Sequence, residues 1–291
     1  MPRTLAVAAV QFEMHPVASF EEFAGQVRKA LDELGTGHQV IVFPELFTSG
    51  LFMVSPGWES DKASDYGRIA DFAEDYRALF AAEAAERGCW ILAGTTLVRT
   101  DRGLENIAFL FGPNGQEHRH SKSHIFPGES AWDTVEGDDL DVIEIDGVTV
   151  GIAICYEVEI PEVTTILSRM GAEVLLVPSY TFTEAGFYRV RHCAAARAIE
   201  DQVYVVHCPV VGNLPAPLSP GFGAPSILSP CDLAFPANGV ITQGQFGQQS
   251  SVSAVLDLDL LHENRADGAA TTRRDRVRRS DMYARYAEFS H

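Results

Sequence analysis

Two kinds of hydrophobic pattern alternate along the chain. Short apolar runs predict buried strands, at residues 4–10, 38–43, 90–97, 106–111, 142–145, 148–154, 174–177, 203–208 and 252–258. Apolar residues at helical spacing predict helices between them, at residues 19–34, 65–87, 161–169 and 187–201. Residues 209–250 are rich in proline and glycine, which favours loops and short strands. The alternation predicts an α/β protein.

The pattern indicates one layered domain followed by a polar tail. No repeat and no linker between two domains occurs in the sequence, so the layers are either helix–sheet–sheet–helix or helix–sheet–helix. Asp146-Gly147 between two apolar runs predicts a tight hairpin. We expect the domain to span residues 1–265 and the arginine-rich tail to span residues 266–291.

Composition and charge narrow the possible partners. Hydrophobic residues make up 46% of the 291 residues, enough for a large core, and the formal net charge is −18. Such a charge disfavours nucleic acid and anionic membranes as partners. The apolar run at residues 5–10 is too short for a signal peptide, and no run reaches the ~18 residues of a membrane helix. Five cysteines without a CxxC pair predict free thiols in a reducing cytoplasm.

Two candidate catalytic residues lie where predicted strands end. Glu45 follows the run Val40–Phe43, and Cys155 follows the run that begins at Val148. Because ligands gather at the carboxyl ends of strands in α/β sheets, these two side chains are expected to face one pocket.

Three blocks of sequence carry a family resemblance. They are Phe43-Pro44-Glu45-Leu46, the segment from Lys122 to Glu129, and the segment from Gly151 to Glu162. In this order, with supporting blocks at residues 8–11, 106–108, 175–179 and 196–202, the chain resembles the nitrilase superfamily, also called the carbon–nitrogen hydrolases. The likeness implies a four-layer α-β-β-α sandwich, no cofactor and no metal. It also implies a homodimer or a higher homo-oligomer in which the C-terminal tail docks on a partner subunit.

The resemblance assigns roles to three residues. Cys155 would attack the substrate, Glu45 would take and return protons, and Lys122 would stabilise the developing negative charge. The backbone N–H of Tyr156 would be a second donor to that charge, and a helix start after Cys155 is expected to favour its thiolate. Glu129 would position Lys122.

Other positions near Cys155 bear on the substrate. Glu159 stands where the family commonly has arginine, which reverses a charge near the nucleophile. The site is therefore expected to recognise a different end of the substrate, either an amine or an uncharged group. Tyr180 opens a segment that lacks the family's frequent Trp-Pro, and is expected to support the substrate or its oxyanion.

Two further sets of residues were considered. Arg197 and Glu200 are expected to pair. His118 and His120 share one face of a strand and could bind zinc, but no HExxH accompanies them, so we expect no metal.

We therefore predict a hydrolase that acts on a small amide-type substrate through a thioester and releases ammonia or an amine. Among the possible substrate classes we expect amides before N-carbamoyl compounds, and nitriles last. Acyl transfer to an amine is an alternative with the same chemistry, and a non-catalytic scaffold on the same fold is an alternative of a different class.

Overall fold

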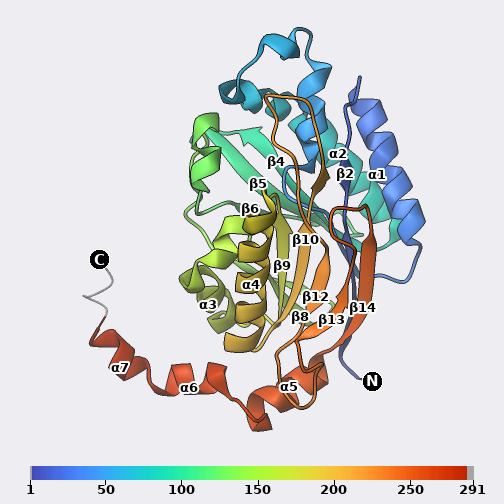
Figure 1. Ribbon diagram of the computed structural model, residues 1–291. Coiled ribbons are helices and arrows are strands. Elements are labelled where there is room, and N and C mark those ends of the chain that lie inside the picture. Colours follow the sequence, from blue (N-terminus) through green and yellow to red (C-terminus); the bar gives the residue numbers. More distant parts are fainter. Residues whose placement is uncertain (1, 287–291) are drawn as a thin grey trace.

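The computed structural model describes residues 2–286; Met1 and residues 287–291, which belong to the predicted domain and tail, lie outside them. Two six-stranded sheets form its centre (Figure 1). The first has the order β14-β1-β3-β4-β5-β6 and the second the order β13-β12-β10-β9-β8-β7.

All nine predicted strands are present, several with slightly different ends. The strands of the first sheet are β1 (Thr4–Val10), β3 (Val40–Val42), β4 (Trp90–Arg99), β5 (Leu104–Phe111), β6 (Glu117–Ser121) and β14 (Ser251–Asp257). Those of the second are β7 (Val142–Ile145), β8 (Val148–Ile152), β9 (Val174–Ser179), β10 (Tyr204–Pro209), β12 (Ser226–Leu228) and β13 (Val240–Gln243). A short parallel pair, β2 (Glu13–Met14) and β11 (Val211–Gly212), lies beside them.

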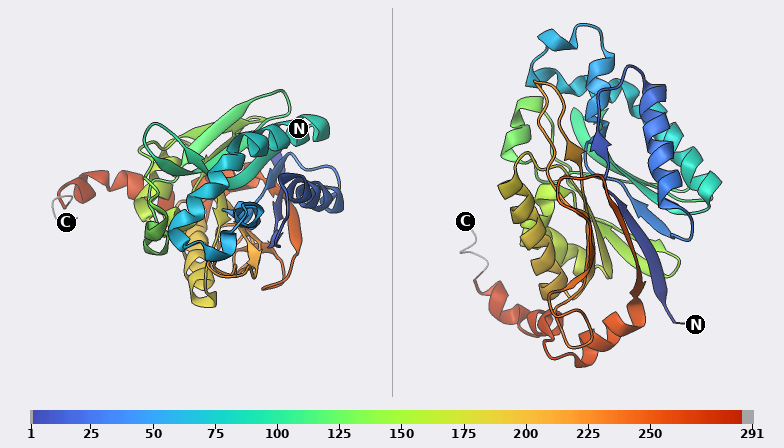
Figure 2. Two further views of the ribbon diagram at one scale, coloured as in Figure 1. Left: turned by 90° about the horizontal axis from the view of Figure 1, so that it is seen from above. Right: turned by 45° about the vertical axis from the view of Figure 1, so that its right-hand side comes forward.

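Helices cover the outer face of each sheet (Figures 1 and 2). The first sheet carries α1 (Phe20–Leu34) and α2 (Ala73–Arg87), and the second carries α3 (Pro161–Arg169) and α4 (Glu184–Glu200). The predicted α-β-β-α sandwich is confirmed. Its centre is apolar: Val7 and Val42 of the first sheet belong to the same buried cluster as Ile152, Leu176 and Val206 of the second.

Local sequence explains how α1 forms. The Ser19 side chain caps it by accepting a hydrogen bond from the Glu22 N–H. Phe23, Val27 and Leu31, four residues apart, are buried on one face of the helix. The predicted hairpin also forms, because Asp146 and Gly147 adopt φ of 50° and 80°, as a tight two-residue turn requires.

Two element predictions were wrong in part. The helix expected over residues 65–87 is a 3₁₀ helix, Ala63–Phe72, followed by α2. Gly67 is a poor helix former there, and Tyr66 packs against Trp132, with ring centroids 4.3 Å apart. The strand expected to reach Ile154 ends at Ile152, because the Ile154 N–H donates to the Glu157 carboxylate instead of to a neighbouring strand.

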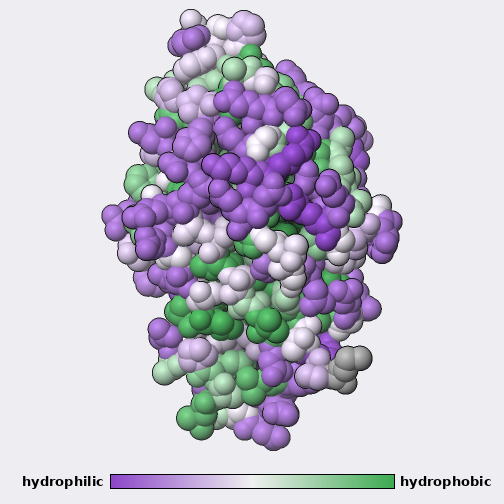
Figure 3. Space-filling view, turned by 90° about the vertical axis from the view of Figure 1, so that its right-hand side faces the viewer, coloured by the Kyte–Doolittle hydropathy of each residue, from purple (hydrophilic) through white to green (hydrophobic). Residues whose placement is uncertain are grey.

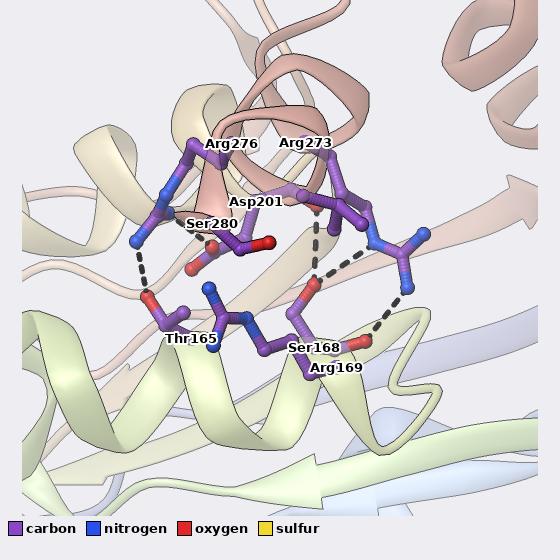
Figure 4. A pocket seen from close by; sticks show the side chains of 8 residues that line it. Thr165, Ser168, Arg169, Asp201, Arg273, Arg276 and Ser280 are labelled. Carbon is purple, nitrogen blue, oxygen red and sulfur yellow. Dashed lines mark hydrogen bonds and ion pairs between the residues drawn. The ribbon is translucent and has the colours of Figure 1, made fainter. Parts of the chain in front are cut away.

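The last described segment, residues 258–284, is mostly helical and leaves the body of the sandwich. It contains α5 (Leu258–Asp267), α6 (Thr272–Arg278) and α7 (Ser280–Ala284), and the predicted boundary at residue 265 falls within α5. In Figures 1 and 2 this red segment passes beneath the sandwich and then projects from it. Arg276 donates to Asp201 and to Thr165, and Arg273 to Ser168, which holds α6 against α3 of the same chain (Figure 4).

The surface is mostly polar. Figure 3 shows the side that carries α1 and β14: hydrophilic residues cover most of its upper half, and hydrophobic ones gather lower down, at the level of β14. β14 is an edge strand, and its Val255 is 67% exposed. Within residues 2–286, no helix combines the length and the apolar character needed to cross a membrane.

Candidate active site

A cavity of about 150 Å³ opens beyond the carboxyl ends of β8 and β9. Cys155, Tyr156 and Glu159 line it from the segment after β8, and Tyr180 from the segment after β9. All four residues were candidates from the sequence, and the fold brings them to one place.

Behind Cys155 lies a buried cluster of charged side chains. Glu45 and Lys122 are both fully buried, and Nζ of Lys122 donates to Oε1 of Glu45 at 2.7 Å. Nζ of Lys122 also donates to the carboxylate of Glu129. The Glu45 carboxylate accepts two further hydrogen bonds, from Nδ2 of Asn106 at 2.9 Å and from the backbone N–H of Tyr180 at 2.8 Å. Each oxygen of Glu45 is therefore fixed in direction.

The charges in this cluster set its protonation. Burial alone would lower the pKa of Lys122, but Glu129 and Glu45 raise it well above its usual range, so the ammonium stays protonated. Burial raises the pKa of Glu129 to about 7. Lys122 lowers this pKa, but the negative charge of the nearby Glu45 opposes that effect. The ammonium of Lys122 thus pairs with two carboxylates, those of Glu45 and Glu129.

Cys155 occupies a strained turn. Its φ is 46°, in the left-handed region that residues with a side chain seldom adopt. It begins a five-residue 3₁₀ helix, Cys155–Glu159, and its Sγ lies 3.6 Å from the carbonyl oxygen of Tyr180. Burial and then Glu45 raise the pKa of the thiol well above its usual range, and Lys122 only partly opposes them. The pKa is therefore shifted in the direction that favours the thiol, opposite to the bias toward the thiolate expected from a helix start.

Glu157 fastens this turn to the segment that carries Lys122. Its carboxylate accepts hydrogen bonds from the Ile154 N–H at 2.5 Å, from the N–H and hydroxyl of Ser123 at 2.7 and 2.6 Å, and from Nε2 of His120 at 2.9 Å. Although burial would raise it, the pKa of Glu157 is lowered because His120 and Ser123 stabilise its charged form. Nε2 of His120 is thus hydrogen-bonded to the Glu157 carboxylate. No cluster of three or more possible metal ligands occurs among residues 2–286.

A glycine places Glu45. A Cβ added at Gly94 in β4 would lie 1.9 Å from the Pro44 carbonyl oxygen, and Gly94 has a φ of +69°. The register of β4 against β5 shifts at this point. Only glycine lets β4 bend around the turn that follows β3 and leave Glu45 facing Lys122.

Comparison with known proteins identifies the family. The family model described as carbon–nitrogen hydrolase matches residues 6–252. The chain belongs to the carbon–nitrogen hydrolase family. This confirms the resemblance to the nitrilase superfamily.

Some relatives of this family match nearly the whole chain. The probable hydrolase YhcX of Bacillus subtilis is 33% identical over 95% of the chain, which spans only 54% of YhcX. The omega-amidase NIT2 of Xenopus tropicalis is 26% identical, with 96% of each chain covered. Among solved structures, Nit3 of Saccharomyces cerevisiae, a member of branch 10 of the nitrilase superfamily, matches with a TM-score of 0.73 at 21% identity, covering 91% of this chain and 94% of its own.

Some residues of this carbon–nitrogen hydrolase site were not singled out from the sequence. Asn106 was noted only within a supporting block, yet it donates to Glu45. Its signal in the sequence is an amide that, together with Glu105, interrupts the otherwise apolar run Leu104–Phe111. His120 was considered only as a metal ligand, and its pairing with Glu157 depends on two segments meeting, which spacing does not reveal. The expected pair of Arg197 and Glu200 is present, at 2.8 Å.

Proposed function

We propose that this protein hydrolyses the carbon–nitrogen bond of a linear amide or an N-carbamoyl compound through a thioester on Cys155. The observation that carries the proposal is the fully buried Lys122–Glu45 pair behind a cysteine that lines a cavity. A buried ammonium with two carboxylates is costly to maintain for stability alone. In an active site, the same cluster can transfer protons and stabilise an oxyanion.

The first half of the reaction acylates the cysteine. As Sγ of Cys155 attacks the carbonyl carbon, its proton passes to the carboxylate of Glu45, which suits a thiol whose pKa is raised. Negative charge develops on the carbonyl oxygen, where the Lys122 ammonium and the Tyr156 N–H stabilise it; one such donor contributes about 3–4 kcal/mol. Glu45 then protonates the leaving nitrogen, the C–N bond breaks, and ammonia or an amine departs.

The second half releases the acid. Glu45 takes a proton from water, and the hydroxyl oxygen attacks the thioester carbon. The same donors stabilise the second oxyanion, the C–S bond breaks, and the proton returns to sulfur. A bound amine in place of water would give acyl transfer.

Product and adduct analysis tests the proposal. Incubation with a panel of amides, N-carbamoyl compounds and nitriles should release ammonia, and intact mass spectrometry should show a transient acyl adduct. Both should be absent in Cys155→Ala, while circular dichroism shows the same fold. Absence of adduct and product across the panel would favour a non-catalytic scaffold, and a new amide formed with added amine would favour acyl transfer.

We also propose that the protein is a homodimer in which the tail of one copy docks on the other. Two properties of the tail support this. Residues 266–286 carry six arginines and three aspartates in a chain of net charge −18. Val277 and Tyr283 in α6 and α7 are 54% and 44% exposed. Analytical ultracentrifugation should give a dimer for the full chain and a weaker one for a chain truncated after Asp267; a full-length monomer at micromolar concentration would contradict the proposal.

A further inference from the structure

Glu159 is a carboxylate in the wall of the Cys155 cavity that lacks one hydrogen-bond donor. It lies four residues after Cys155, and its side chain is only 11% exposed. Oε2 accepts from Nε of Arg189 at 2.7 Å. Oε1 is buried without a hydrogen-bond partner among the residues that the structure describes. Because leaving a buried carboxylate oxygen unpaired is costly, a further donor brought by a ligand would stabilise Glu159.

Arg189 does not supply that donor. It comes from α4 at the cavity mouth, its side chain is 48% exposed, and it binds Glu159 through Nε. Its guanidinium lies over the ring of Phe126, 5.7 Å from the centroid. The mouth of the cavity therefore already accommodates one cation, between a carboxylate and an aromatic face.

The rest of the cavity favours a positive charge as well. Three aromatic residues line it in addition to Phe126: Tyr156, Tyr180 and Phe182. Aromatic faces attract cations, most strongly where water is excluded. The other cation close to Glu159 is Lys122, whose charge is already met by Glu45 and Glu129. A net charge of −18 would further concentrate cationic ligands near the protein.

We propose, on the basis of the function proposed above, that the substrate is a small amide whose acyl part carries a primary ammonium group. The amide carbon lies at Cys155, and the ammonium donates to the carboxylate of Glu159 beside the aromatic wall. A substrate with a carboxylate at the same distance is disfavoured, because its charge meets that of Glu159. Glu159 is thus the residue that determines specificity.

Three amides of equal length test this. 5-Aminopentanamide and hexanamide share four methylene groups and end in a cation and a methyl group. Glutaramate has three methylene groups and ends in a carboxylate, so its chain has the same number of heavy atoms along its length. Ammonia release at pH 7 should give a kcat/KM for 5-aminopentanamide about 10-fold or more above that for hexanamide, the value expected of a hydrogen bond to a charged group. Glutaramate should be the poorest substrate. Equal or better turnover of hexanamide or glutaramate would overturn the proposal while leaving hydrolysis itself supported.

Substitutions sharpen the result. In Glu159→Gln the preference for the cation over hexanamide should fall to about 3-fold or less, mainly through KM, since one charge-assisted hydrogen bond is lost. Glu159→Arg should shift the preference toward glutaramate. The matched control is Glu162→Gln, on the exposed start of α3, which should keep the wild-type ratio. Arg189→Gln should keep or increase the preference for the cation; a loss of that preference would assign recognition to Arg189 instead.

A binding assay that needs no turnover covers the case in which none of the three amides reacts. Alkylation of Cys155 by iodoacetamide, followed by intact mass, should be slowed by n-butylammonium more than by n-butanol or propionate. The extra protection should disappear in Glu159→Gln. If no amide is hydrolysed but this protection is seen, the proposed function fails for these amides and the cation site stands. Equal protection by all three additives would overturn the cation site.

Discussion

The buried charge cluster and the C-terminal tail are both rich in ions but are built in opposite ways. Glu45 accepts hydrogen bonds from β5, from the segment after β6 and from the start of the segment after β9, and it is fully buried. In the tail, Arg274 and Arg278 reach partners within the tail itself, and Arg278 and its partner Asp275 are 64% and 53% exposed. The first arrangement needs the whole fold, whereas much of the second needs only local helix.

This difference teaches where charge can do chemistry. An ion pair in water contributes little because solvent screens it, and a surface pair typically amounts to about 0–1 kcal/mol. The same charges without water interact strongly and cannot reorient freely, so they can meet a developing oxyanion without reorganisation. We therefore expect substitutions in the cluster to affect catalysis and those in the tail to affect stability slightly.

The largest effect is expected from Lys122→Ala. It removes the proposed oxyanion donor and should lower kcat/KM at least about 100-fold. Unfolding in urea should show a loss of about 3–5 kcal/mol, because two buried carboxylates lose their ammonium. The protein should remain folded, since Glu129, with a pKa of about 7, can bind a proton. Lys29→Ala is the control, with a side chain 75% exposed, and should change neither quantity appreciably. Near-normal turnover of Lys122→Ala would contradict the role proposed for it.

A smaller effect, on the scaffold of the cluster, is expected from Gly94→Ala. The new methyl group would meet the Pro44 carbonyl oxygen, and Glu45 would move from Lys122. Gly57→Ala is a matched control, because Gly57 also has a positive φ, +81°, but nothing lies within 4 Å of its Cβ position. Both variants carry the cost of a left-handed alanine, and overpacking should cost Gly94→Ala about 1–3 kcal/mol more in urea unfolding. Only Gly94→Ala should also lose activity. Equal unfolding free energies in the two variants would mean that the close approach at Gly94 is unimportant.

The sequence predicted the parts of the site that depend on strand ends. Glu45 and Cys155 each follow a short apolar run, and the carboxyl ends of such strands meet in a layered α/β fold. Lys122 came from the family resemblance alone, because nothing in its local pattern distinguishes it from a solvated lysine. The α-β-β-α layers likewise needed the resemblance, since alternation alone left a three-layer fold open.

The features that were missed depend on contacts between distant segments. The raised pKa of Cys155 comes from burial and from Glu45, more than 100 residues earlier, so a local helix start was a poor guide. The break between the 3₁₀ helix and α2 is of the same kind, since Tyr66 packs against Trp132. Short-range rules describe elements well, and they fail where a tertiary contact decides.

The smallest effect is expected from Arg276→Gln in the tail. Asp201 is buried, with a side chain 3% exposed, and Arg276 reaches it from α6 at 2.7 Å (Figure 4). Because Arg276 itself is 32% exposed, the pair is partly screened, and the unfolding free energy at pH 8 should fall by only about 1 kcal/mol. Arg278→Gln is the control and should cost less than about 0.5 kcal/mol, as expected of an exposed pair within one helix.

The pH dependence of that loss identifies its cause. Burial raises the pKa of Asp201, and Arg276 lowers it, so Arg276 stabilises the fold only while Asp201 is ionised. The difference in unfolding free energy between wild type and Arg276→Gln should therefore be fully present at pH 8 and shrink as the pH falls through the pKa of Asp201. Turnover of the amide panel should be the same in both proteins. A difference that stays constant with pH would assign the contribution of Arg276 to its packing and to its hydrogen bond with Thr165, which would make this contact of the tail independent of charge.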